Sequence, residues 1–339
     1  MRYSLATLLA IAATSQALSF HDIRDFGSRV LQEAGRGPRA PQGPPPGVPA
    51  PPPNGVPRAP PGNGEIGNCP AVWQQVAKEL STSMVSDGQC NDMARGAIRA
   101  AFHDCGTWDM TQGTTGGCDG SLYLAKEYTR EENRGLQDIV PKIGALAEKY
   151  KVGVADMIQF AGASAVKLCP GGPTVRTMVG RKDSSTPNPE GNLPNVHAPG
   201  DDLVALFNKK GISAVELAAL VGAHTASKQN LVDPAKAGAP QDTTPGKWDV
   251  EFYSQTLDKT APFTFPSDQQ ISMQRESGPA FKSFARNQFG WTAAFSGAMT
   301  HLSLLGVASP EKLTDCTTSL PGGSRRRDVK AAPINGRAV

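Results

Sequence analysis

The stretch Arg95-Gly-Ala-Ile-Arg-Ala-Ala-Phe-His-Asp-Cys105 is the most informative segment of this 339-residue chain. Apolar residues recur at three- and four-residue spacing around it, which predicts a helix over 93–103. Arg99 and His103 are four residues apart and therefore share one face of that helix. A permanent cation beside an imidazole lowers the imidazole pKa by like-charge repulsion. The segment thus predicts a neutral base next to a fixed positive charge, which suits a reaction that removes a proton while an anion develops nearby.

The same helical spacing continues along most of the chain between the first and the last cysteine. It predicts further helices over 72–84, 135–150, 154–166, 203–209, 214–224, 281–289 and 291–305. Asp201 or Asp202 is expected to cap one helix, and Ser213 with Glu216 matches a capping box at another. Strand-like runs are few and short, so the predicted fold class is all-α.

A second histidine, His224, follows a run of small and apolar residues that is itself helical in period. Each histidine is accompanied by a loop rich in oxygen-bearing side chains. Gly117-Cys-Asp-Gly-Ser121 follows the first histidine, and Asp242-Thr-Thr-Pro-Gly-Lys-Trp-Asp249 follows the second. Alternating Asp, Ser and Thr oxygens with backbone carbonyls are the ligands that Ca²⁺ prefers. One such loop is usually a solvated turn, but two of them, each tied to a histidine, predict cation sites.

The two ends of the chain are not expected to belong to the folded domain. Residues 1–17 combine a charged start, a short apolar run and a small-x-small cleavage pattern, which predicts a secretory signal too short to span a membrane. Residues 18–64 are expected to be a pro-segment and a Pro-rich linker. Residues 321–339 are expected to be a basic, flexible tail, which leaves 65–320 as the expected domain. We therefore expect a secreted, extracellular protein.

The charge and the hydropathy of the sequence argue against two classes of protein, nucleic-acid-binding proteins and polytopic membrane proteins. Residues 65–320 carry 23 basic and 27 acidic side chains, a net charge of −4, so nucleic-acid binding loses its electrostatic support. Past the N-terminus no run of eighteen apolar residues occurs, which excludes a polytopic membrane protein.

All 6 cysteines lie within 69–316, and an even number in a secreted chain predicts three disulfides. Spacing alone leaves all fifteen connectivities open.

Seven motifs together resemble the plant-type haem peroxidase superfamily, and within it the secreted fungal class II branch of lignin, manganese and versatile peroxidases. The motifs are Arg99-x-x-Phe102-His103-Asp104-Cys105, Gly117-Cys-Asp119-Gly-Ser121, Val154-Ala-Asp-Met-Ile-Gln-Phe-Ala-Gly162, Cys169-Pro-Gly-Gly-Pro173, Gly180-Arg-Lys-Asp183, Leu220-Val-Gly-Ala-His224-Thr225 and Leu313-Thr-Asp-Cys316. The resemblance covers Cys69 to about Cys316. It implies an all-α fold of about ten helices, with haem b held between a distal and a proximal half.

The resemblance also implies a role for each matching residue. His103 resembles the distal acid/base and Arg99 the distal cation, while His224 resembles the proximal iron ligand. The supporting residues would be Phe102 as a wall of the peroxide pocket, Asn133 orienting the distal histidine, Asp268 accepting from the proximal histidine, and Pro194 placing a carbonyl near the donor site. Hydrogen peroxide would be reduced, and small phenolic or aromatic donors would be oxidised by one-electron steps in a monomeric enzyme.

Two Ca²⁺ ions and a disulfide pattern follow from the same resemblance. The distal calcium site would use Asp104, Gly117, Asp119 and Ser121, and the proximal one Thr225, Asp242, Thr244, the Lys247 carbonyl and Asp249. Among the fifteen connectivities it selects Cys90–Cys169 and Cys69–Cys316, as in the fungal branch, and Cys105–Cys118, as in the plant branch.

Departures from the fungal relatives bear on the substrate. Lignin and versatile peroxidases carry a surface Trp five residues before the proximal histidine, where this chain has Ala219. Manganese peroxidases use two Glu and one Asp, and the matching positions here are Asp92, Gly96 and Asn230. One carboxylate of three is a poor site for a hard dication. We therefore expect a generic peroxidase that oxidises phenols and dyes at the haem edge.

A second class of function is a secreted, non-catalytic module that binds cell walls on a peroxidase scaffold, through the Pro-rich arm and the basic tail. Against it, Arg99, His103 and His224, which peroxide cleavage requires, are all present. Trp108 and Trp291 are the remaining candidates for oxidisable side chains, although packing is the usual role of such residues.

Overall fold

The computed structural model describes residues 69–322, so the segments predicted for 1–17 and 18–64, and all of the tail beyond Gly322, lie outside it. Within the described residues the chain forms eleven α-helices and four strands of two residues each. The strands make two small antiparallel pairs, β1 (Val85–Ser86) with β2 (Gln89–Cys90) and β3 (Met178–Val179) with β4 (Thr314–Asp315). The all-α prediction is confirmed.

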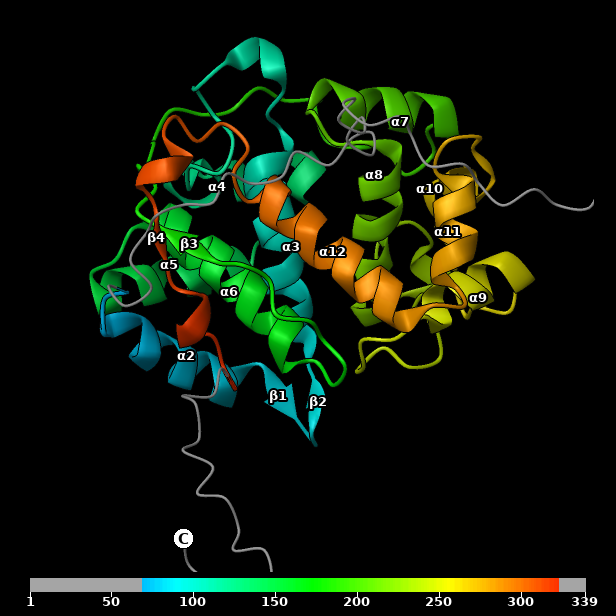
Figure 1. Ribbon diagram of the computed structural model, residues 1–339, viewed down its shortest axis with the longest axis horizontal. Helices are drawn as coiled ribbons and strands as arrows, with labels where there is room; N and C mark the ends of the chain where they lie inside the picture. Colours follow the sequence, from blue (N-terminus) through cyan, green and yellow to red (C-terminus); the bar gives the residue numbers. More distant parts are fainter. Residues whose placement is uncertain (1–68, 323–339) are drawn as a thin grey trace, which may run out of the picture. The chain divides into compact units, whose positions relative to one another are not determined.

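The first five helices of this segment form one group in which α6 contacts the other four, as Figure 1 shows on the side drawn in blue to green. They are α2 (Val72–Ser83), α3 (Asp92–Gly106), α4 (Ser121–Leu124), α5 (Ile139–Tyr150) and α6 (Val154–Leu168). Helix α3 lies along α6. The two helices approach so closely at Gly162 that a Cβ added there would lie only 2.5 Å from the Cβ of Ala101. Small residues on both helices thus allow their backbones to approach.

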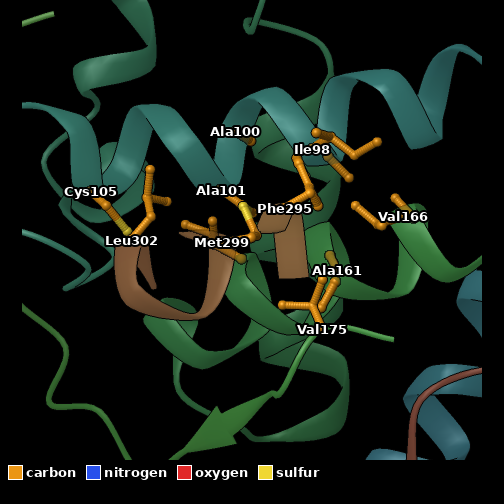
Figure 2. Packing of buried hydrophobic residues seen from close by; sticks show 14 of the residues in the cluster. Ile98, Ala100, Ala101, Cys105, Ala161, Val166, Val175, Phe295, Met299 and Leu302 are labelled. Atoms are coloured by element: carbon orange, nitrogen blue, oxygen red, sulfur yellow. The ribbon is translucent and has the colours of Figure 1, made fainter. Parts of the chain in front are cut away.

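The remaining helices gather around α8. They are α7 (Gly200–Lys209), α8 (Ala214–Val221), α9 (Glu251–Asp258), α10 (Pro266–Met273), α11 (Gly278–Phe284) and α12 (Gln288–Leu302). Helix α12 contacts both α8 and α3 and so joins this group to the first one. In Figure 2, Phe295, Met299 and Leu302 of α12 point toward side chains of α3 and α6. None of the helices in the described segment is long and apolar enough to cross a membrane.

Several predicted boundaries are wrong by a few residues. The helix predicted over 214–224 ends at Val221 and continues as the 3₁₀ helix η4 (Gly222–Ala226), and the last helix ends at Leu302 rather than 305. The helix predicted over 281–289 is a shorter α11 followed by a turn. The Ser213–Glu216 capping box is present, whereas Pro199 precedes the helix at which Asp201 or Asp202 was expected as the cap.

Three disulfides cross-link the described residues. The pairs are Cys69–Cys316, Cys90–Cys169 and Cys105–Cys118, the same three that the resemblance implies. The first closes 247 residues and fastens the start of the described segment to its end. The third closes 13 residues and fixes the loop that follows α3, so it restrains the segment next to His103.

Candidate active site

His103 lies near the end of α3, buried, with both ring nitrogens engaged. Its Nδ1 is 2.7 Å from Asn133 Oδ1, and Asn133 Nδ2 donates to the Glu127 carbonyl at 2.8 Å. The second bond orients the amide so that its oxygen faces the ring. An amide oxygen only accepts, so Nδ1 carries the proton and Nε2 presents its lone pair. The Glu127 carbonyl, which sets this orientation, is a backbone group without a sequence signal.

Arg99 lies on the same face of α3, one turn earlier, as its spacing predicts. Its Nε donates to His103 Nε2 at 3.1 Å, and its Nη1 donates to the Arg134 carbonyl at 2.9 Å. Burial, followed by the charge of Arg99, lowers the pKa of His103 to about 3, although the bond to Asn133 opposes the shift. The predicted direction is therefore present, but burial rather than like-charge repulsion is the larger cause. Phe102 sets its ring edge-on to the imidazole, 5.6 Å between centroids.

His224 lies in η4, directly after α8, beside a buried carboxylate. Its Nδ1 is 3.0 and 3.1 Å from the two oxygens of Asp268, which comes from α10 and is fully buried. The rings of Phe252 and Phe265 flank the imidazole, with centroid-to-centroid distances of 5.7 and 5.3 Å. Because the carboxylate holds the proton on Nδ1, Nε2 is left as an acceptor, and it makes no hydrogen bond within residues 69–322.

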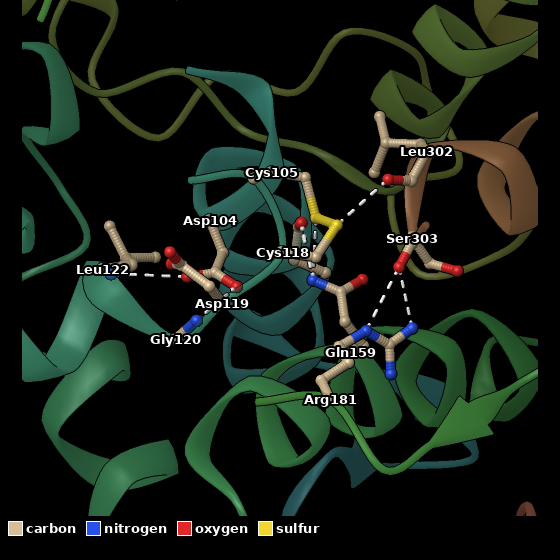
Figure 3. The surroundings of a disulfide bond; sticks show 12 residues. Asp104, Cys105, Cys118, Asp119, Gly120, Leu122, Gln159, Arg181, Leu302 and Ser303 are labelled. Atoms are coloured by element: carbon tan, nitrogen blue, oxygen red, sulfur yellow. Dashed lines mark hydrogen bonds between the residues drawn. A yellow bond between two sulfur atoms is a disulfide. The ribbon is translucent and has the colours of Figure 1, made fainter. Parts of the chain in front are cut away.

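The oxygen-rich loop beside His103 does form a cluster (Figure 3). Asp104 is fully buried and accepts from the backbone N–H groups of Gly120 and Leu122 at 3.2 and 3.3 Å. Burial and the neighbouring Asp119 carboxylate raise the pKa of Asp104 well above its usual range. The buried hydroxyl of Ser121 has no hydrogen-bond partner. The cluster thus holds two crowded carboxylates and an unpaired oxygen.

A second cluster lies beside His224. Thr225 Oγ1 donates to Asp242 at 2.6 Å, and Thr244 Oγ1 lies 3.0 Å from Asp249. Burial is the main cause that raises the pKa of Asp242 to about 6, with the charge of Asp249 adding to it. Lys247 lies in the same loop with its N–H bonded to the Thr244 carbonyl.

The remaining candidate residues belong neither to the two histidine sites nor to the two oxygen-rich clusters. Pro194 is half-buried in the loop before α7 and is in none of the hydrogen bonds described for the histidines. Asp92 is paired with Arg95 at 2.8 Å and with Lys228 at 3.6 Å. Within residues 69–322, no three His, Cys, Asp or Glu side chains converge as a metal site. Trp291 is fully buried and donates to the Ala219 carbonyl, as a packing residue does.

His103 beside Arg99 and His224 beside the buried Asp268 are the two sites that the resemblance to haem peroxidases leads us to expect. Comparison with known proteins agrees, because the family model described as Peroxidase matches residues 72–287. The chain therefore belongs to the peroxidase family and is a hydrogen-peroxide-dependent oxidoreductase that acts on aromatic donors.

Relatives at moderate identity extend over most of the chain. It is similar to a low-redox potential peroxidase of Taiwanofungus camphoratus, 31% identical over 74% of this chain and 77% of the relative. It is also similar to manganese peroxidase 3 of Phlebia radiata, 27% identical over 75% of this chain and 80% of the relative. Ligninase LG2 of Phanerodontia chrysosporium is 28% identical over 74% of each chain. The fungal class II branch is thus the one that the comparisons support.

Proposed function

We propose that His103 is the acid/base of peroxide cleavage and that Asn133 and Arg99 prepare it for that role. The observation that carries the proposal is the chain of bonds from the Glu127 carbonyl through Asn133 to His103 Nδ1, which leaves Nε2 as the unprotonated nitrogen, where it accepts from Arg99 Nε until the substrate arrives. Nε2 takes the proton from one oxygen of hydrogen peroxide and gives it to the other, which leaves as water. A base with a lowered pKa stays neutral, and so able to accept, in mildly acidic surroundings.

Arg99 stabilises the negative charge that develops on the peroxide once its proton has moved to His103. Burial lowers the pKa of Arg99 to about 10, which still leaves the guanidinium charged at neutral and acidic pH. Its bond to the Arg134 carbonyl holds it in place before the substrate arrives. Charge that is already oriented needs no reorganisation during the reaction. Phe102 forms an apolar wall beside the same imidazole, and Pro194 offers its carbonyl near the donor site.

His224 is the proposed ligand of the haem iron, and its surroundings fit that role. Its free Nε2 is the atom that would bind iron, and the Asp268 carboxylate on Nδ1 would increase the electron donation of the ring. Bound haem b would supply the two electrons that cleave the O–O bond and regain them singly from two donor molecules. The task of the protein at this position is to hold the imidazole in one tautomer and one orientation.

The two oxygen-rich clusters are proposed as calcium sites. Support for the distal site comes from the crowded Asp104 and Asp119 and the unpaired hydroxyl of Ser121, since a dication would offset the repulsion and satisfy the orphaned oxygen. Gly117 would add a carbonyl. The proximal site would take its oxygens from Thr225, Asp242, Thr244, Asp249 and the Lys247 carbonyl.

The donor is proposed to be a small phenol oxidised at the haem edge, without a manganese site. Asp92 already pairs with two cations. At Gly96 an added Cβ would lie only 3.0 Å from Ile139, so a glutamate there would have to displace that side chain. Ala219, at the position of the surface tryptophan of lignin peroxidases, is buried. Saturable oxidation of Mn²⁺ at micromolar concentration would contradict this part of the proposal.

Secretion, a monomeric state and the domain limits 65–320 are proposed from the sequence patterns, with residues 1–17 as the signal. The three disulfides support an oxidising compartment.

The decisive experiment mixes the haem-loaded enzyme with one equivalent of hydrogen peroxide and follows the Soret absorbance by stopped flow. His103→Gln should slow the reaction by roughly 10²–10⁴-fold, the range for losing a positioned base. His197→Gln, at an exposed histidine, is the matched control and should leave the rate unchanged. If both variants react as fast as the wild type, the base lies elsewhere.

A further inference from the structure

A cavity open to the surface is lined by none of the residues assigned to peroxide cleavage. It has a volume of about 260 Å³ and lies between the loop after α3, the end of α7 and the end of α12 with the turn that follows it. Its walls are mainly apolar and include Trp108, Met110, Leu304 and Val307. The polar side chains that line it are Lys210 and His301, and none of the lining residues is acidic. A cavity of this size admits a single aromatic ring with a small substituent.

Lys210 is the unusual member of this lining. It is only 1% exposed, and its Nζ donates to the Trp108 carbonyl at 3.1 Å. An ammonium group has three N–H donors, and this is the one hydrogen bond of Nζ within residues 69–322; no carboxylate there forms an ion pair with it. A buried charge without a directly paired carboxylate is costly, and Asp109 acts on Lys210 only from beyond ion-pair distance. The cavity therefore borders a cation whose hydrogen-bonding capacity is largely unused by the protein.

His301 adds a second nitrogen with a fixed orientation. Its Nδ1 is 2.8 Å from Glu216 Oε1, and Glu216 is itself held by the capping box with Ser213 at the start of α8. This leaves Nε2 as the ring nitrogen free of protein hydrogen bonds among the described residues. One wall of the cavity is thus aromatic and aliphatic, while two nitrogen-bearing side chains belong to its polar part.

The structure assigns this cavity, we infer, to a small single-ring aromatic carboxylate. The ring would lie against Trp108 and the leucine and valine side chains, where its apolar surface is removed from water. The carboxylate would accept hydrogen bonds from Lys210, since charge-assisted bonds to a buried ammonium are the strong ones. His301 would border the ligand without donating to its carboxylate, because Nδ1 donates to Glu216 and Nε2 is then an acceptor. The assignment does not depend on the roles proposed for His103 and His224, because binding here requires no peroxide.

The surroundings of Lys210 also predict how binding depends on pH. Burial lowers the pKa of Lys210 to about 8, Asp109 in the loop after α3 opposes the shift, and Lys209 on α7 adds to it. The other ionisable groups on the packed elements are His301 of α12 and its partner Glu216 of α8. An anion beside Nζ favours the ammonium form, so affinity for a carboxylate should fall as the pH rises through 8 and beyond.

The test uses the haem-loaded full chain and two probes of nearly equal shape, benzoate and the neutral benzamide, titrated by calorimetry at pH 6.5. Lys210→Met should weaken benzoate binding about tenfold or more, the usual effect of losing a hydrogen bond to a charged group. Benzamide binding should change less than about threefold. Lys209→Met, at the exposed neighbouring lysine, is the matched control and should leave both affinities unchanged.

Two further measurements distinguish binding in this cavity from binding in the haem pocket and from a purely structural role of Lys210. The Soret band is recorded during each titration, and benzoate in the surface cavity should leave it unchanged. Leu304→Trp, which adds bulk to the cavity lining and keeps Lys210 in the sequence, should abolish the binding of both probes while the protein stays folded by circular dichroism. The inference is overturned if benzoate binds Lys210→Met and Leu304→Trp as tightly as the wild type, or if its only binding event shifts the Soret band.

Discussion

Acid should destabilise this protein through His103, and the size of the effect follows from its burial. The imidazole has an ordinary pKa of 6.5, which falls to about 3 in the folded chain. Between these values the unfolded chain binds a proton that the folded chain does not bind. The free energy of unfolding must then decrease as the pH is lowered from about 6.5 to about 3, and His103 has no effect above that window.

The magnitude comes from the difference between the two states. Each unit of pKa difference corresponds to about 1.36 kcal/mol, so His103 should cost about 2 kcal/mol of stability at pH 5 and roughly 5 kcal/mol at the acid limit. A glutamine at this position cannot bind the proton. The wild type should therefore lose about 2 kcal/mol more than His103→Gln when the pH falls from 7.5 to 5.

Urea unfolding of the two haem-loaded proteins, followed by circular dichroism at both pH values with calcium present, measures this difference. The raised pKa values of Asp104 and Asp242 act in both proteins and cancel in the comparison. If the two proteins lose stability in parallel, the folded protein accepts a proton on His103 as readily as the unfolded one. In that case the ring is not held neutral, and its proposed role as base loses its physical support.

Three further outcomes are expected. Asp268→Asn should weaken electron donation through His224, raising the reduction potential of the haem-loaded enzyme and slowing its reaction with peroxide by roughly 10–100-fold, measured by spectroelectrochemistry and stopped flow. Ser213→Ala should reduce the free energy of unfolding by about 1 kcal/mol, measured by urea denaturation, because it removes the cap of α8 and its bond to Glu216. Prolonged treatment with a calcium chelator should lower the Tm, and added Ca²⁺ but not Mg²⁺ should restore it, since Mg²⁺ dehydrates reluctantly and requires a near-octahedral site.

The helices that sequence predicts best are those whose apolar face is buried. The period in 93–103 and 154–166 corresponds to α3 and α6, which pack directly on each other. Helices α9 and α10 were not predicted. Segment 266–273 has only three apolar residues, counting Pro266, and its helix depends on packing against α7, α9 and α11. Those contacts join segments far apart along the chain, which a local pattern does not contain.

In the candidate site, too, features set by local spacing were predictable from the sequence, whereas features set by contacts between distant segments were not. The pairing of Arg99 with His103 is a consequence of helix geometry and was predictable from a spacing of four residues. The partnership of His224 with Asp268 spans 44 residues and could be expected only from a resemblance to a known family. The orientation of Asn133 depends on a backbone carbonyl, which any residue type could supply. The cavity beside Lys210 had no sequence signal, because a lysine at the end of a helix is ordinarily exposed.

The two histidines show how one side chain acquires opposite properties from its neighbours. His103 has a cation on one nitrogen and a neutral amide oxygen on the other, so nothing near it favours the protonated ring except the weaker bond to Asn133. His224 has a buried carboxylate on Nδ1, which increases the electron density available at Nε2. Exchanging the partners would make the first ring a cation unable to accept a proton and the second a weak ligand. The chemistry therefore depends on α10 bringing its carboxylate to η4 while α3 brings its arginine to its own histidine.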